Sequence, residues 1–283
     1  MAKLDSAGAT DLTNRHAKYR RRKYQPGRLD KLERWTKIIG IVATVFGFLW
    51  TTWTYSIESK VRSFEQRQKA WSIINEHVRQ VRCDGQGETE VPKYHTNSGQ
   101  IDAVEFLVSQ HASLNGIGMP CSEFGGLRAA GAVIDNGHFW MSNFTLATLD
   151  DTELFQIDLD RSTLDGATFR GANLGEAKLH GIYAKWTDFS KAKLSKAKIP
   201  GSDLSDANFK GAILISANLR RSRVTDADFT GADLADADVE GVCYVPRKAN
   251  EQHGDGQPVG WPTSLKKPVV CPSDWSVQIN DSE

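Results

Sequence analysis

The sequence lacks the features that usually identify an enzyme. Its seven histidines are scattered, and none belongs to a metal-binding pair such as H-E-x-x-H. It contains no phosphate-binding loop, dinucleotide fingerprint or G-x-S-x-G nucleophile elbow. Its four cysteines form no C-x-x-C pair of the kind that holds zinc. We therefore predict a protein without catalytic residues, metal or cofactor.

Charge of one sign is also lacking, because 35 basic and 35 acidic residues balance over the 283 residues. Long apolar runs are absent except at 38–57, twenty residues without a charge that would span about 30 Å as a helix. Aromatic residues flank this run, with Trp35 at one end and Trp50, Trp53 and Tyr55 at the other, as in interfacial anchors. We predict a transmembrane helix that contacts membrane lipid. The alternatives are a buried helix of a soluble protein and a cleaved signal peptide.

Basic residues are concentrated before this run, in the predicted tail 1–37, and fewer follow it. Since cytoplasmic flanks carry the excess of Lys and Arg, we expect a single-pass cell-membrane protein with a cytoplasmic N-terminus and a periplasmic or extracellular C-terminal domain. All four cysteines follow the run, on the side expected to be oxidising. Sequence proximity favours the pairs Cys83–Cys121 and Cys243–Cys271, although the other connectivities, metal binding and free thiols stay open.

The strongest feature of the sequence is a five-residue repeat over 139–244. A large apolar residue occupies almost every fifth position, with Ala184 as the weak exception. The clearest centres are Phe144, Leu149, Leu154, Leu159, Leu164, Phe169, Leu174, Leu179, Phe189, Leu194, Leu204, Phe209, Leu214, Leu219, Phe229 and Leu234. A period of five does not keep to one face of a 3.6-residue helix, and a six-residue left-handed β-helix would place its apolar residues elsewhere.

Within each repeat, a small residue stands two positions before the centre and a polar one lies between them, as alternation in an extended segment requires. Glycine often follows two positions after the centre, where a turn needs a permissive backbone. The segments 172–174, 207–211 and 232–234 show this A-(D/N)-L-x-G pattern most clearly. The pattern resembles the pentapeptide-repeat family. That resemblance implies an all-β solenoid, a right-handed quadrilateral β-helix with about 20 residues per coil.

The flanking segments are expected to close this solenoid and connect it to the membrane. We predict an amphipathic stalk helix at 58–82 and a cap at 83–138, made of a loop, a short helix and early repeats through Leu114, Met119 and Phe124. An irregular cap is predicted at 245–283, with Trp261 and Trp275 over the last coil. At one repeat the two inward positions are exchanged: Ile182 occupies the position that is usually small, and Ala184 occupies the centre that is usually large. This exchange predicts a local bend.

Two charged groups are candidates for a binding surface. The basic group is Lys191, Lys193, Lys196 and Lys198, and the acidic group is Asp233, Asp236 and Asp238. We therefore predict a non-catalytic, membrane-anchored interaction or scaffolding module with a protein or glycan partner, and homo-oligomers stay open. The alternatives are a cytoplasmic-facing scaffold and an inhibitor that mimics DNA, a function known for some members of the resembled family. Because the acidic excess here is small and the rod is expected outside, no nucleic-acid partner is expected.

Overall fold

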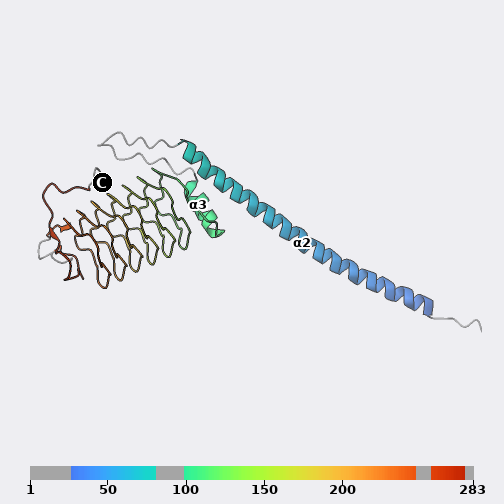
Figure 1. Ribbon diagram of the computed structural model, residues 1–283. Coiled ribbons are helices and arrows are strands. Elements are labelled where there is room, and N and C mark those ends of the chain that lie inside the picture. Colours follow the sequence, from blue (N-terminus) through green and yellow to red (C-terminus); the bar gives the residue numbers. More distant parts are fainter. Residues whose placement is uncertain (1–26, 81–98, 247–255, 278–283) are drawn as a thin grey trace, which may run out of the picture. The chain divides into compact units, whose positions relative to one another are not determined.

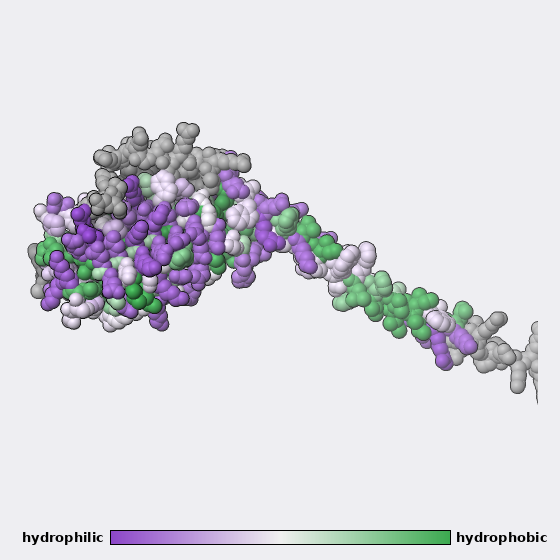
Figure 2. Space-filling model, viewed as in Figure 1, coloured by the Kyte–Doolittle hydropathy of each residue, from purple (hydrophilic) through white to green (hydrophobic). Residues whose placement is uncertain are grey.

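The computed structural model describes residues 27–80, 99–246 and 256–277, and the chain divides into two units after Ser63. The first unit contains most of helix α2, Gly27–Gln80. Figure 2 shows its apolar stretch, and these side chains are exposed: Ile39, Phe46, Phe48, Trp50, Trp53 and Tyr55. Among the described residues, α2 is the helix long and apolar enough, by length and composition alone, to cross a membrane. It continues without a break through the predicted boundary between span and stalk.

The second unit begins with the end of α2 and helix α3, Gln100–Ser109, which together cover one end of a stack of coils (Figure 1). Ile74 of α2 and Leu107 of α3 are buried in the same apolar core as Leu114, the first centre of the stack. The short helix expected before the repeats is therefore present. Its apolar side chains remove the open edge of the first coil from water, as a cap must.

The stack is a β-solenoid whose coils repeat every 20 residues. Residues 20 apart form parallel bridges in an unbroken series, from Gly118–His138 to Arg223–Cys243. Within the described residues only β1, Cys243–Tyr244, and β2, Val269–Val270, are long enough to count as strands. The reason is geometric, because each side of a coil has five residues and two of them form the corner. The backbone pairing is therefore that of an all-β fold, although almost every side of a coil is joined to the next coil by a single bridged residue.

The solenoid begins earlier than the predicted boundary at Phe139. The Leu114 N–H already donates to the Val133 carbonyl at 2.9 Å, which is the hydrogen bond that joins later coils. Ala129, a poor match to the repeat, is fully buried in the centre position of its side. The early repeats expected within 83–138 are therefore regular coils, and they begin at Leu114. Ala129 was misleading because a small centre is tolerated where its neighbours in the core are large.

The core of the solenoid is a set of columns of side chains stacked from coil to coil. One column is aromatic: the rings of Phe169, Phe189, Phe209 and Phe229 stack with centroid separations of 5.3, 5.1 and 4.9 Å. The apolar cavity at the N-terminal end of the core measures about 10 Å³, too little for a ligand. Burial of each large centre contributes roughly 1.5–3 kcal/mol. The interior is thus used for stability and leaves the outer faces for binding.

The corners explain why glycine recurs in the repeat. The residue two positions after each centre has a positive φ at nearly every corner, whatever its type. Glycine adopts this conformation freely, whereas L-residues with a Cβ adopt it at a cost. Leu146 (φ 60°) and Trp186 (φ 56°) are the least expected corner residues, and their side chains are 68% and 65% exposed.

The bend predicted at Ile182 and Ala184 is absent. Both side chains are fully buried, and Tyr183 between them bridges to Thr163 and Asp203 as in a regular coil. The Ala184 N–H donates to the Asp203 carbonyl at 2.8 Å. The prediction was wrong because the exchange conserves volume: the large residue moves to the small position and the small residue to the large one. Cores tolerate such exchanges when their total volume is kept.

The C-terminal cap closes the other end of the stack. Val259 bridges to Asp228 in the place of a further coil, and the Trp261 ring contacts the Phe229 ring edge-on with centroids 5.0 Å apart. Trp261 therefore covers the end of the aromatic column, as predicted. Trp275 instead lies on the side of the last coil, where its Nε1–H donates to the Arg221 carbonyl at 3.1 Å.

A disulfide between Cys243 and Cys271 joins this cap to the last coil. It lies where β1 pairs in parallel with β2, in the register Cys243 to Val269. The predicted Cys83–Cys121 pair stays a prediction, because Cys83 lies outside the described residues.

Replacing Cys271 with serine is expected to loosen the C-terminal cap. The disulfide closes a loop with a sequence separation of 28, and cross-links over such loops typically contribute about 3 kcal/mol. We expect residues 256–277 to be cut by protease in the variant under conditions in which the wild-type cap is protected. Lys267→Ser, an exposed change in the same segment, is the control. Equal protection of the cap in both variants would contradict a stabilising role for the bond.

Candidate functional site

The four predicted lysines do not form one patch. All four lie within a single coil, so they follow one another around it: Lys191 and Lys196 are at corners with φ of 59°, and Lys193 and Lys198 are on two different sides. Residues become neighbours on the surface when they are 20 apart, because the coil then returns to the same side. The sequence run therefore overstates how concentrated the positive charge is.

A groove of about 590 Å³ brings two of these lysines together with residues from other coils. Its lining is polar: Asn136, His138, Gln156, Glu176, Lys178, Lys196 and Lys198. These residues come from two adjoining columns, one at a corner and one on the next side of the solenoid. Lys178 and Lys198 are bridged neighbours in the second column. A groove with three lysine side chains favours a ligand with carboxylate or phosphate groups.

The lysines of this groove differ in how far their charges are compensated. Lys196 lies 3.7 Å from Glu176, and Lys178 lies 3.4 Å from Asp158. Lys198 has no ion pair among the described residues, so its ammonium group is available to a ligand. Exposed ion pairs contribute little to stability. A stronger anionic ligand would therefore displace Glu176 and Asp158 at small cost.

Asp160 and His180 lie beside the groove, on the same side of the solenoid. The backbone N–H of His180 donates to the Asp160 carboxylate at 2.8 Å. Burial raises the pKa of Asp160 despite this hydrogen bond, and the nearby charge of Asp158 acts in the same direction. The Nε2 atom of His180 is buried without a hydrogen-bond partner among the described residues. From the sequence, His180 was expected to be a surface residue of the repeat, so the burial of its Nε2 atom was not predicted.

The three predicted aspartates lie in the same columns as three of the lysines, two coils further on. The bridges run from Lys193 through Ile213 to Asp233, and from Lys198 through Asn218 to Asp238. Asp236 follows Lys196 at the corner with the same 40-residue offset. Asp238 is compensated by Arg220 at 3.4 Å. Each of the three aspartates thus shares a column with one of the lysines and lies two coils away from it.

The pentapeptide-repeat family model matches residues 132–181, 187–226 and 212–243 in eight copies. The repeat region of this chain belongs to the pentapeptide-repeat family. The match omits 182–186, the repeat in which Ile182 and Ala184 are exchanged, although the backbone there is regular. Pentapeptide-repeat proteins form right-handed β-helices, and the 20-residue period found here makes each coil four-sided.

Solved structures of other pentapeptide-repeat proteins are similar to this domain. One is QnrB1, a plasmid-mediated fluoroquinolone resistance protein (20% identity, 46% of this chain, 84% of that chain, TM-score 0.18). A second is HetL of the cyanobacterium Nostoc (20%, 52%, 94%, 0.22). A third is a protein of the Arabidopsis thaliana thylakoid lumen (23%, 46%, 74%, 0.13). No curated protein matches the chain.

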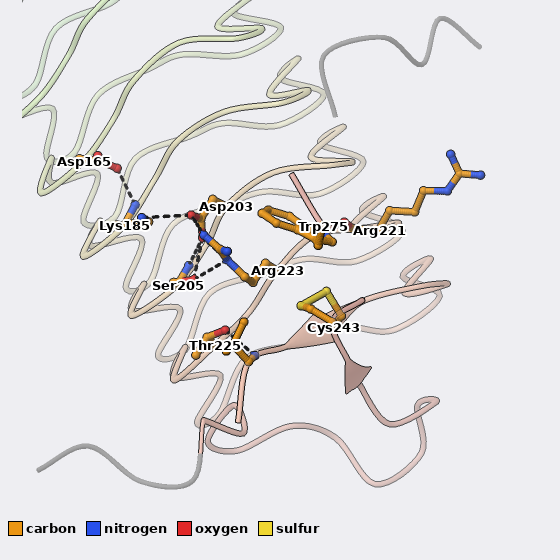
Figure 3. A network of polar contacts seen from close by, with 11 residues as sticks. Asp165, Lys185, Asp203, Ser205, Arg221, Arg223, Thr225, Cys243 and Trp275 are labelled. Atoms are coloured by element: carbon orange, nitrogen blue, oxygen red, sulfur yellow. Dashed lines mark hydrogen bonds and ion pairs between the residues drawn. A yellow bond between two sulfur atoms is a disulfide. The ribbon is translucent and has the colours of Figure 1, made fainter. Parts of the chain in front are cut away.

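A separate polar network stabilises the pentapeptide-repeat domain at its C-terminal end (Figure 3). The buried Asp203 carboxylate accepts hydrogen bonds from the Arg223 guanidinium and from the Ser205 hydroxyl, the latter at 2.6 Å. The Lys185 ammonium lies 3.5 Å away, and the Arg223 guanidinium stacks 4.3 Å from the centre of the Trp275 ring. The network links three coils to the cap and places two positive charges beside the buried Asp203 carboxylate.

The pKa of Asp203 reflects this compensation. Burial alone would raise it, but hydrogen bonds from Arg223 and Ser205 and the charges of Arg223 and Lys185 lower it below its ordinary value of 3.8. Asp165 shows the opposite case, because burial raises its pKa although it accepts a hydrogen bond from the Lys185 N–H. Asp203 is therefore a stable anion inside the domain and serves the fold instead of a ligand.

Proposed function

We propose that this chain is a non-catalytic, single-pass membrane protein whose pentapeptide-repeat domain binds an anionic partner outside the cytoplasmic membrane. The groove around Lys198 carries this proposal, because it gathers three lysines from two coils and leaves one of them unpaired among the described residues. The class of partner is defined by carboxylate or phosphate groups, on either a glycan or a protein.

Membrane anchoring is proposed for 38–57. The exposed apolar side chains of this part of α2 would be costly in water over such a length, and a lipid bilayer is the environment that suits them. Exposed Trp50 and Trp53 lie at the end predicted to meet the outer interface. The basic residues before the span support a cytoplasmic N-terminus, and the Cys243–Cys271 disulfide supports an oxidising compartment for the domain.

The topology is tested by reporter fusions in the full chain. A reporter that is active only in the cytoplasm and one that is active only outside it are each placed after Cys83 and after Glu283. We expect activity at both sites only for the outside reporter. Cytoplasmic activity at either site would contradict the proposed location.

The groove is tested by reversing two of its lysines. Lys178→Glu with Lys198→Glu should weaken binding of the full chain in nanodiscs to heparin, used as a model acidic glycan, at least tenfold at 0.1 M salt, because two attractive charges become repulsive. Poly-glutamate serves as the model acidic protein and shows which chemistry the groove prefers.

The matched control for this change is Lys266→Glu with Lys267→Glu. These two exposed lysines lie in the C-terminal cap, away from the groove, and their reversal alters the net charge by the same amount. We expect the control to change binding less than threefold. Equal losses in the two variants would mean that only the overall charge attracts the polyanion, and would refute a site in the groove.

A further inference from the structure

One side of the solenoid carries exposed isoleucines where the repeat normally has polar residues. Ile213 and Ile215 lie on the outer surface of one coil, with 37% and 36% of their surfaces exposed. The preceding coil has Lys193 in the column of Ile213, and the following coil has Asp233 there. An apolar centre therefore lies between a positive and a negative residue in a single column.

The two charges in this column are not compensated within the chain. In the part of the chain that the structure describes, Lys193 makes no ion pair, and the Asp233 carboxylate accepts a hydrogen bond only from the backbone N–H of Ala235, at 3.0 Å. The two side chains cannot reach each other across Ile213 without leaving their own coils, because two coil spacings separate them by roughly 9.6 Å. Both charges thus remain available to a second molecule.

We propose that this side of the solenoid, centred on Ile213 and Ile215, is the contact between two copies of the chain. The copies would be related by a two-fold axis that runs along the side of this coil, perpendicular to the solenoid axis. Such an axis places each Ile213 against Ile213 of the partner subunit. It also sets Lys193 opposite Asp233 of the partner subunit and Asp233 opposite Lys193 of the partner subunit. The contact is isologous, with the same patch used twice.

Charge complementarity selects a second copy in antiparallel orientation. The columns keep their order under this two-fold axis, so the contact between Lys193 and Asp233 forms twice in each dimer. A parallel pair would place lysine against lysine and aspartate against aspartate, which is repulsive. End-to-end pairing is blocked at both ends, since α3 covers the first coil and Trp261 the last. One side of a solenoid is narrower than the roughly 800 Å² per partner of a standard interface, so the dimer is expected to be weak and concentration-dependent.

Charge exchange tests the contact in the full chain in nanodiscs or detergent. Lys193→Asp should weaken dimerisation at least tenfold in sedimentation experiments, because two carboxylates then face each other twice in each dimer. Adding Asp233→Lys to the same chain should restore dimerisation, because the column is complementary again with reversed signs. Both sites are exposed, so thermal unfolding should change little. A dimer that is insensitive to Lys193→Asp, or a double variant that is not restored, would overturn the proposal.

Cross-linking tests the position of the two-fold axis. Ile213→Cys places a thiol next to the same thiol of the partner subunit and should give a disulfide-linked dimer on oxidation. Leu146→Cys, at a more exposed corner on another side, should not. Equal cross-linking of the two variants would refute the geometry. Failure here leaves the proposed groove untouched, because Lys178 and Lys198 lie on a different side and heparin binding of Lys193→Asp is expected to match that of the wild type.

Discussion

Replacing Leu194 with aspartate is expected to prevent folding of the pentapeptide-repeat domain. Leu194 is fully buried and stacks in one column between Leu174 and Leu214. The change removes about 1.5–3 kcal/mol of apolar burial, and a carboxylate left unpaired in the core costs several kcal/mol more. The total is comparable with the roughly 5–15 kcal/mol that stabilises a typical domain. Circular dichroism and protease resistance of the purified variant would measure the loss.

The matched control for this variant is Lys191→Asp, which adds a carboxylate three residues away at an exposed corner. Aspartate adopts positive φ more readily than most residues, and several corners of this domain already carry it. We expect the control to stay within about 1 kcal/mol of the wild type. A Leu194→Asp variant that resisted protease as well as this control would show that the column is not the core.

Replacing Arg223 with alanine is expected to cost about 3–5 kcal/mol, because it leaves the buried Asp203 carboxylate without its main partner. The variant also loses the stacking of the guanidinium on Trp275. Urea unfolding would measure the change. Lys210→Ala is the control, since it removes an exposed pair with Asp228 at 2.9 Å and should cost at most about 1 kcal/mol.

The same network gives the domain a defined response to acid. Because the folded pKa of Asp203 is lowered below 3.8, its contribution is fully present above that pH and is lost as the pH falls through the folded value. Asp203→Asn combined with Arg223→Ala removes both charges, so it should recover part of the stability lost in Arg223→Ala and lack this acid-dependent loss. A double variant no more stable than Arg223→Ala would contradict the proposed cost of the unpaired carboxylate.

The core of this protein was predictable because each coil obeys a local rule. Large apolar centres recur every five residues in a strict register, and Phe169 and Phe209 are two of them. Only an inward-facing position requires such side chains. The caps at the two ends were predictable for a related reason. Apolar residues outside the repeat, such as Leu107 and Trp261, are stable only when they are buried against the apolar ends of the solenoid. The Ile182–Ala184 exchange was misread because the repeat rule describes positions, whereas packing responds to the summed volume of neighbours.

The candidate site was less predictable because surface neighbours are far apart in sequence. Lys191 to Lys198 suggest a cluster of four when they are read in order, yet the groove contains only the last two of them, together with Lys178 and His138 from other coils. Reading the sequence in rows of 20 would have found this column. The partners of Asp203 could not be found in that way alone, because its burial depends on Ser205 and on the packing of Trp275 against Arg223.

The corner conformation has a consequence for how this domain tolerates insertions and deletions. All corners share one backbone geometry, so removing five residues would join two equivalent corners and keep every later centre inside. Each residue after the deletion would nevertheless move by a quarter turn, so a deletion between Lys193 and Lys198 would separate Lys178 from Lys198 and Lys193 from the Ile213 column. Only changes in steps of 20 residues preserve both interior and exterior. A five-residue period therefore maintains the buried core of the fold, whereas a 20-residue period maintains the surface columns that would bind a partner.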